Sequence, residues 1–166
     1  YTHTTSSGAL KGIMSKNGRR FVIQTIQGVA TFDIPEQAPN GPVVIEVTPM
    51  YFPVIPFNSQ GVIPLALSFD GNMMLGRDTI GSGFIRLYVW TGVDWKQHRT
   101  VVSGSFFNIA DISRNGTYVV IGGYGASGAP VKTFKWDPST ETYNEYGGTT
   151  LYAVNNADSI SINQNV

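Results

Sequence analysis

The sequence contains no cysteine, which excludes disulfide bonds and thiolate metal sites. Charge is also scarce: only 13% of the 166 residues are charged, and 11 Lys and Arg are balanced by 11 Asp and Glu. A chain without excess positive charge does not favour binding to nucleic acid or to an anionic membrane surface. No apolar run approaches the roughly 18 residues that a membrane-spanning helix requires. We therefore expect neither a nucleic acid nor a membrane among the partners of this chain.

Helical periodicity is absent too, because no stretch of about ten residues places apolar side chains at i, i+3, i+4 and i+7. The chain instead holds 19 Gly and 9 Pro between short runs rich in Val, Ile, Thr and Tyr. Such runs, bounded by turn-forming residues, are typical of β-strands. The sequence therefore predicts an all-β protein.

One short stretch occurs three times in the chain, and it predicts three hairpins. The copies read GIMSKNGRRFVIQ from Gly12, LALSFDGNMMLGR from Leu65 and DISRNGTYVVIGG from Asp111. Each aligns a serine, an Asn or Asp, a glycine and then apolar residues. A tight hairpin needs positive φ, which Gly adopts without strain and Asn or Asp adopts more easily than most residues. We expect the hairpin tips on one face of the molecule, at Asn17-Gly18, Asp70-Gly71 and Asn115-Gly116.

A third strand follows each hairpin, as VATFDI from Val29, IRLYVW from Ile85 and VKTFKW from Val131. The alternation of apolar and polar residues in these segments suits a half-buried strand. Large aromatic residues repeated in one column favour packing between repeats over a sugar-stacking platform of tryptophans. The aligned aromatic residues are Phe32, Tyr88 and Phe134 in one column, Trp90 and Trp136 in a second, and Tyr51, Trp95 and Tyr143 at the expected start of a fourth strand.

The repeat length indicates the architecture. The aligned serines are Ser15, Ser68 and Ser113, with a weaker copy at Ser161, so the spacing is 45 to 53 residues. Four strands in a unit of this length are typical of one β-propeller blade. We expect four-stranded antiparallel blades in units of about 1–50, 51–94 and 95–142, with a partial unit at 143–166. The whole chain is then a single segment of a larger propeller.

The stretches 67–97 and 112–146 resemble the repeats of WD-like and FG-GAP-like β-propellers, which combine an S-P-D-G turn with a V-Y-x-W strand. Lys16, Phe69 and Arg114 stand where those repeats have proline, and the Asp-x-Asp-x-Asp-Gly calcium loop of integrin-type blades is missing. Repeats of this kind occur in bacterial surface proteins and bacteriophage virion proteins. The resemblance therefore implies a binding or structural module.

The number of repeats has a consequence for partners. Propellers typically close with about four to eight blades, more than these units supply. Three arrangements stay open: a longer polypeptide, a ring completed by several copies, or an open arc packed against another protein. We expect residues 158–166 to pair with a strand outside these 166 residues, because bare strand edges lack hydrogen-bond partners. The expected partners are other protein subunits or the rest of the same chain, with a cell-surface glycan as a further candidate.

Residues suited to catalysis or metal binding are few. The two histidines, His3 and His98, lie far apart without the spacing of metal ligands. The stretch GGYGASGAP at 122–130 is not followed by the lysine and helix of a phosphate-binding loop, and no G-x-S-x-G nucleophile elbow occurs. We expect no catalytic residue, no metal site and no cofactor, and therefore a protein that is not an enzyme.

Two pairs of acids keep an enzymatic alternative open. Asp70 with Asp78, and Asp111 with Asp158, could come together as the paired carboxylates that glycoside hydrolysis uses. The turn already explains Asp70, since Asp is favoured beside a turn glycine. A propeller hydrolase or lyase is therefore the less favoured alternative.

A binding site is expected at the end of the blades opposite the Asn/Asp-Gly turns. The loops at that end vary in length and composition, and variable loops on a constant frame are the usual place for recognition. These loops are residues 25–28, 56–61, 78–83, 103–107, 124–130 and 149–157. The candidate binding residues are Arg77, Asp78, Phe106, Phe107 and Tyr124.

The leading functional hypothesis is a non-enzymatic propeller module of an extracellular or virion assembly, such as a phage tail or capsid-surface component. It would supply protein contacts or host attachment. The low charge and abundant Ser, Thr, Asn and Gly favour this extracellular or virion location. The first alternative is a segment of a carbohydrate-binding adhesin, which requires exposed aromatics beside Asn or Asp.

Overall fold

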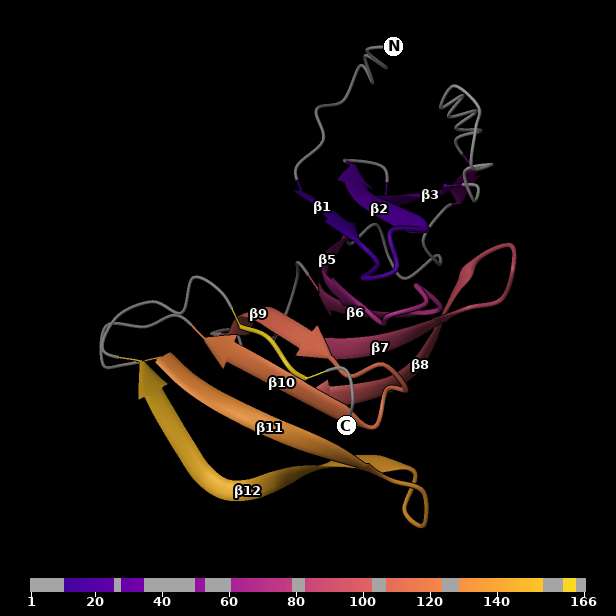
Figure 1. Cartoon of the computed structure of the whole chain (residues 1–166). Helices are drawn as coiled ribbons and strands as arrows, with labels where there is room; N and C mark the ends of the chain where they lie inside the picture. The colour runs from indigo at the N-terminus through magenta and orange to yellow at the C-terminus, as the bar shows by residue number, and fades with distance from the viewer. Residues whose placement is uncertain are drawn as a thin grey trace.

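The computed structural model describes residues 11–25, 28–34, 50–52, 61–78, 83–102, 107–123, 129–153 and 160–163. These residues form twelve strands in three four-stranded antiparallel sheets, and none of them is helical. Each sheet follows chain order from its first strand to its fourth (Figure 1). The protein is therefore all-β and is built of four-stranded propeller blades, as the sequence predicts. Within the described part of the chain, no helix has the length and hydropathy needed to cross a membrane.

Each blade is one sheet, and the blades are numbered in chain order. Blade 1 contains β1 (Lys11–Met14), β2 (Arg20–Thr25), β3 (Gly28–Asp33) and β4 (Met50–Phe52). Blade 2 contains β5 (Val62–Leu67), β6 (Met73–Asp78), β7 (Ile85–Trp90) and β8 (Trp95–Val102). Blade 3 contains β9 (Phe107–Ile112), β10 (Tyr118–Gly123), β11 (Ala129–Asp137) and β12 (Thr142–Ala153). The first strands β1, β5 and β9 contact one another in sequence, so they are the innermost strands.

The blades are offset from the sequence units at 1–50, 51–94 and 95–142. Those units count from the fourth strand of one blade through the third strand of the next. In the structure, β8 begins at Trp95 and closes blade 2, and β12 closes blade 3. Trp95 pairs with Trp90 and Tyr143 with Trp136, whereas Tyr51 pairs with Ala30 and does not share that register.

The same hydrogen bonds close all three predicted hairpins. The turn glycine donates its N–H to the carbonyl of the serine three residues earlier, at 2.9 Å for Gly18 and 3.0 Å for both Gly71 and Gly116. The serine hydroxyl accepts a bond from the first amide of the second strand, and the Asn or Asp side chain accepts one from the residue after the glycine. The glycine φ angles are +72, +75 and +74°. The predicted turns are therefore confirmed.

The turns also lie side by side on one face. The backbone N–H of Asn17 donates to the carbonyl of Phe69 in the next turn. The guanidinium of Arg114 in the third turn stacks over the ring of Phe69, 4.0 Å from its centre. Neighbouring turns are thus in direct contact, which confirms their expected placement at a common end of the blades.

The aromatic column of the third strands is confirmed as well. In each blade, the residue three positions after the turn glycine pairs with the column aromatic: Phe21 with Phe32, Met74 with Tyr88, and Val119 with Phe134. Equal register means that these aromatics occupy equivalent positions in the three sheets.

Two apolar clusters fill the spaces between blades. One joins blade 1 to blade 2 around Val22, Met74 and Trp95, and Trp90 packs against it. The other joins blade 2 to blade 3 around Leu75, Val119 and Phe134, and Trp136 packs against it. Trp95 is 2% exposed and donates from Nε1 to Oγ1 of Thr31 at 2.8 Å. The repeated tryptophans therefore belong to the packing between blades, as expected from their shared columns.

Arg20 adds a polar connection between blades 1 and 2. Its guanidinium donates two hydrogen bonds to Asp33, at 2.6 and 2.9 Å, one to the carbonyl of Gly71 at 3.0 Å and one to Oδ1 of Asn72 at 3.1 Å. It also lies over the ring of Trp90, 4.7 Å from the centre. A buried arginine is tolerated because these four hydrogen bonds use most of the five donors of its planar fork.

Replacing the turn glycines by alanine is expected to destabilise the protein to different degrees. Each substitution places a Cβ in the left-handed region, at a cost of about 1–2 kcal/mol. At Gly18 the new Cβ has no atom within 4 Å, but at Gly71 it would lie 2.8 Å from Cβ of Arg20. We expect Gly71→Ala to lower the free energy of unfolding by about twice the loss for Gly18→Ala, because packing strain is added.

Gly116→Ala is expected to fall between these two, since its Cβ would meet the flexible Met73 side chain, 2.6 Å from the sulfur. Urea unfolding followed by tryptophan fluorescence gives the three free energies. Equal losses at Gly18 and Gly71 would contradict the close approach between blades.

Candidate functional site

The candidate site lies at the loop end of the blades, which is the end opposite the Asn/Asp-Gly turns. The innermost strands β1 and β9 begin at this end and β6 ends there. Three of the five expected binding residues are described, namely Arg77 and Asp78 at the end of β6 and Phe107 at the start of β9. Phe106 and Tyr124 lie outside the described residues, as do most residues of the expected loops.

Arg77 bridges blades 2 and 3 at this end. One of its terminal nitrogens, Nη1, donates to the backbone carbonyl of Phe107 at 3.3 Å. Its Nε is buried and has no hydrogen-bond partner in the described part of the chain. An unsatisfied buried donor on a charged group costs free energy unless something binds to it. The guanidinium is therefore only partly satisfied by the protein.

Lys11, the first residue of β1, adds a second positive charge. Burial lowers the pKa of its ammonium group, and the positive charge of Arg77 lowers it further. Among the described residues, no acid forms an ion pair with Lys11 or Arg77. Two neighbouring cations without a counter-charge favour binding of an anion.

Asn108 follows Phe107 on β9, and its Oδ1 is also buried without a hydrogen-bond partner among the described residues. An amide oxygen is an acceptor with two lone pairs, so a hydroxyl group of a ligand could satisfy it. Buried polar atoms without a hydrogen-bond partner are rare in folded proteins, so each one needs an explanation. The loop end thus carries an unpaired donor on β6 and an unpaired acceptor on β9.

Asp78 does not belong to this arrangement, although the sequence places it beside Arg77. Adjacent residues of a strand point to opposite faces of the sheet. The Asp78 carboxylate accepts a hydrogen bond from Nε of Arg86 at 2.8 Å, in a partly buried ion pair within blade 2. Burial first, and then the Asp78 charge, raises the pKa of the nearby Tyr88 hydroxyl. Asp78 is therefore engaged in a structural ion pair.

The expected pair of Asp70 and Asp78 does not form a site in the described structure. Asp70 lies in the turn before β6 and Asp78 at the other end of that strand, so their carboxylates are separated by its length. Asp111 instead accepts hydrogen bonds from Nζ of Lys16 at 2.7 Å and from the backbone N–H of Ile162 at 2.9 Å. Asp158, its expected partner, lies outside the described residues.

Metal ligands and histidines add no second site among the residues that the structure describes. In the part of the chain that the structure describes, no three His, Cys, Asp or Glu gather as a metal ion would require. His98 is exposed on β8, with its ring 6.1 Å from the ring of Trp136. His3 lies outside the described residues.

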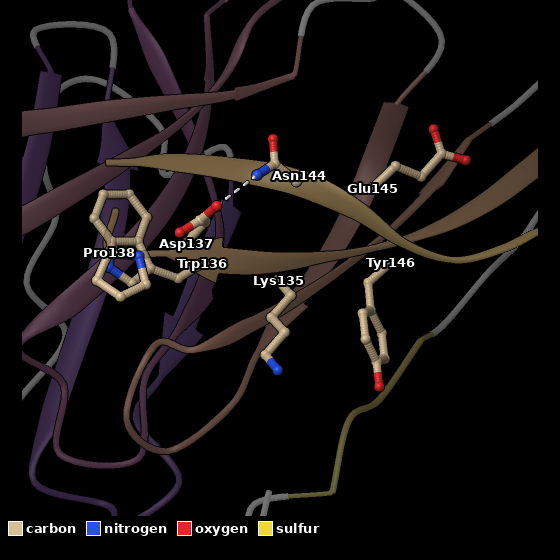
Figure 2. A pocket seen from close by; sticks show the side chains of 7 residues that line it. All are labelled: Lys135, Trp136, Asp137, Pro138, Asn144, Glu145 and Tyr146. Carbon is tan, nitrogen blue, oxygen red and sulfur yellow. Dashed lines mark hydrogen bonds between the residues drawn. The ribbon is translucent and has the colours of Figure 1, made fainter. Parts of the chain in front are cut away.

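A hollow of about 310 Å³ lies elsewhere, on the hairpin of β11 and β12 in blade 3. Figure 2 shows the side chains of Lys135 and Tyr146 extending to one side of this hairpin, away from the bond between Asn144 and Asp137. The hollow is open and its lining is mixed in polarity. It contains neither of the unpaired buried atoms of the loop end.

Lys11 and Asn108 are the site residues that the sequence reading missed. Both lie at the starts of innermost strands, and Asn108 also directly follows the expected loop 103–107. The only signal in the sequence is a polar residue at the beginning of an apolar strand, which is common and therefore weak. Their proximity to Arg77 follows from the packing of blades and not from local sequence.

No family model matches the chain, and no curated protein matches its sequence. Solved structures share its fold. The chain superposes on a proposed 6-phosphogluconolactonase of Bacteroides fragilis with a TM-score of 0.57 and 14% identity, covering 94% of this chain and 42% of that one. For a second proposed 6-phosphogluconolactonase, from Bacteroides uniformis, the values are 0.54, 15%, 88% and 41%.

The β-propeller domain of Cps50 (Swd1) from Myceliophteria thermophila is also similar, with a TM-score of 0.52 and 14% identity, covering 69% of this chain and 35% of that one. This likeness confirms the propeller fold. The chain spans about two fifths of the length of the first two structures.

These comparisons correct the expected function. The hypothesis of a non-enzymatic phage or surface module, with a carbohydrate-binding adhesin as its alternative, is wrong, because the similar structures include two proposed lactonases. The expectation that the protein is not an enzyme is wrong for the same reason. The physical reason is that turn and strand columns specify a blade, and the same blade serves enzymes and structural proteins alike.

The lowered pKa of Lys11 predicts a measurable pH dependence of stability. Because the folded-state pKa lies below the ordinary value of 10.5, the unfolded chain binds more protons between those two values. The free energy of unfolding contributed by this group therefore rises with pH across that window. We expect Lys11→Met to flatten this rise, as measured by urea unfolding at a series of pH values. An unchanged difference between the variant and the original chain at every pH would contradict the burial of the ammonium group.

Proposed function

We propose that this chain is part of a propeller hydrolase that opens the ring ester of an anionic sugar lactone. The observation that carries the proposal is the buried, unpaired Nε of Arg77, next to the second uncompensated charge of Lys11. The fold shared with two proposed 6-phosphogluconolactonases supports it, since a sugar lactone with an anionic group matches this chemistry.

In this proposal, Arg77 and Lys11 bind the anionic group of the substrate. A guanidinium can present Nε together with a terminal nitrogen to two oxygens of one phosphate or carboxylate, which gives strong and directional hydrogen bonds. The partly buried location strengthens the attraction, because water screens the charges less than at an open surface. The negative charge of the anion would also offset the repulsion from Arg77, which adds to burial in lowering the pKa of Lys11.

Asn108 would orient the sugar part of the substrate. Its unpaired Oδ1 can accept a hydrogen bond from a sugar hydroxyl, which a neutral hydrocarbon ligand could not donate. The reaction adds water to the lactone carbonyl and breaks the ring C–O bond, which yields the open-chain hydroxy acid. The contribution of the described residues is to hold the ring in place for that attack.

The proposal is tested first by binding, using 6-phosphogluconate, the stable product of the proposed hydrolysis, as the probe. Calorimetry is expected to detect binding to the original chain and a weakening of about tenfold or more for Arg77→Gln, because a charge-assisted hydrogen bond is lost. Arg99→Gln is the matched control: Arg99 on β8 pairs with exposed Glu141 in the turn between β11 and β12, so affinity is expected to stay unchanged. Glucose, which has no anionic group, is expected to bind much more weakly.

Hydrolysis is measured on 6-phosphoglucono-δ-lactone in a pH-stat, against the spontaneous rate. A rate above background that falls for Arg77→Gln supports the lactonase assignment. Equal affinity of Arg77→Gln and the original chain for 6-phosphogluconate would overturn the anion site. Binding without any hydrolysis would restrict the function of this chain to ligand recognition.

Two expectations from the sequence stay predictions. The first is the resemblance to WD-like and FG-GAP-like repeats, which is based on sequence motifs. The second is the extracellular or virion location, which is based on composition alone. Detection of the native protein in cell fractions would test the location.

A further inference from the structure

Two of the repeated turns contain an Asn-Gly pair, and such a pair can react with itself. The backbone nitrogen of the glycine attacks the side-chain carbonyl carbon of the asparagine, because glycine has no Cβ to block the approach. A C–N bond forms, and the side-chain amide takes the glycine proton and leaves as ammonia, which gives a five-membered succinimide ring. Water then opens the ring to aspartate or isoaspartate. The two asparagines are Asn17 in blade 1 and Asn115 in blade 3, and a third pair, Asn40-Gly41, lies outside the described residues.

Both turns prepare the reacting carbonyl in the same way. Its oxygen, Oδ1, accepts one hydrogen bond from the turn serine and one from the backbone N–H two residues later. These bonds measure 2.7 and 2.9 Å at Asn17, and 3.1 and 3.0 Å at Asn115. Negative charge develops on this oxygen as the glycine nitrogen attacks, so two donors aimed at it stabilise the transition state. The carbonyl therefore gives neither asparagine a large advantage.

The two glycines differ much more. Ring closure has to turn the Asn-Gly peptide group, which takes the glycine nitrogen out of its bond to the serine carbonyl. Gly18 is half-exposed, and a Cβ built on it has no atom within 4 Å. Gly116 is buried, its carbonyl accepts a bond from the Tyr143 hydroxyl at 2.6 Å, and the Met73 side chain lies against it. The peptide group can therefore turn more easily at Gly18 than at Gly116.

Exposure of the asparagines ranks the two sites in the opposite order. Asn115 is exposed, whereas Asn17 is half-buried and donates its own N–H to the carbonyl of Phe69 at 3.1 Å. That bond lies on the other side of the Asn17 Cα from the peptide group that turns, so the reaction leaves it in place. The relative rates at the two sites thus distinguish control by the glycine from control by exposure of the asparagine.

We propose that Asn17 is a deamidation site of the folded protein, and that the Tyr143 hydroxyl and the Met73 side chain shield the Asn115-Gly116 pair from the same reaction. This modification concerns the turn end of the blades and is independent of the lactonase activity.

The two products have different consequences for blade 1. Blade 2 already has aspartate at the equivalent position, where the Asp70 carboxylate accepts bonds from Oγ of Ser68 at 2.7 Å and from the N–H of Asn72 at 3.0 Å. Aspartate at position 17 therefore keeps the turn. Isoaspartate places an extra carbon in the main chain, which changes the spacing of the turn and displaces the bond to Phe69.

The experiment measures deamidation of the full chain in heavy-oxygen water at mildly alkaline pH, both folded and in urea. Opening of the succinimide by water labels the modified residue, and mass spectrometry of chymotryptic peptides gives the rate at each asparagine. In the folded chain, Asn17 is expected to react about tenfold faster than Asn115, because Asn115 has to wait for local opening of blade 3. In urea both are expected to react at similar rates, since glycine follows each of them.

Tyr143→Phe removes only the hydroxyl that donates to Gly116. It is expected to raise the rate at Asn115 in the folded chain about threefold or more, because opening of the turn becomes easier, and to leave the rate at Asn17 unchanged. Tyr88→Phe is the matched control. It removes a buried hydroxyl close to Asp78, at the other end of the blades, and is expected to change neither rate.

Equal rates at Asn17 and Asn115 in the folded chain, or a faster reaction at Asn115, would overturn the proposal in favour of control by side-chain exposure. Reaction of Asn17 in urea alone would overturn it as well. A rate at Asn115 in Tyr143→Phe no higher than in Tyr88→Phe would overturn the proposed shielding. Asn17→Asp, which carries the product from the start, is expected to keep the free energy of unfolding of the original chain.

Discussion

The left-handed glycine of the serine-Asn/Asp-Gly turn is the constraint on which the blades depend. Locally, its positive φ reverses the chain between the two innermost strands, while the serine and the Asn or Asp side chain hold the turn with hydrogen bonds. Between blades, the missing Cβ lets the preceding blade approach, as Arg20 does at Gly71 and Met73 at Gly116. One residue thus sets both the hairpin and the spacing of the blades.

Buried charged groups are hydrogen-bonded more completely at one end of the blades than at the other. At the turn end, Arg20 uses its donors on Asp33, Gly71 and Asn72, and Asp111 is matched by Lys16 and the N–H of Ile162. At the loop end, Arg77 keeps a buried N–H without a partner in the described structure. The buried charge that the protein pairs incompletely is therefore the one that supports the proposed ligand site.

The frame could be predicted from the sequence because its signals are local. Turn chemistry specified the hairpins at Gly18, Gly71 and Gly116, and strand alternation specified the aromatic column of Phe32, Tyr88 and Phe134. The boundaries between blades were harder to predict from the sequence, because no repeated turn marks where a fourth strand begins or ends. β8 and β12 were assigned to the following units for that reason.

The site could be predicted only in part. Arg77 was found because it ends a strand at the variable end, but Lys11 and Asn108 reach it from blades 1 and 3 through packing alone. Asp78 begins the expected loop 78–83, but strand alternation places its side chain on the opposite face from that of Arg77. Its ion pair with Arg86 shows which face it occupies.

The geometry of the loop end also depends on the core between blades. Arg77 belongs to blade 2 but donates to a carbonyl of blade 3, so a small rotation between these blades would change the direction of its unpaired Nε. The cluster of Leu75, Val119 and Ile121, each 0% exposed, resists such a rotation because a close-packed interior leaves no space to slide. Close packing between blades 2 and 3 therefore fixes the direction of the Arg77 Nε, and in the proposed site this preorganisation would lower the entropic cost of binding a ligand.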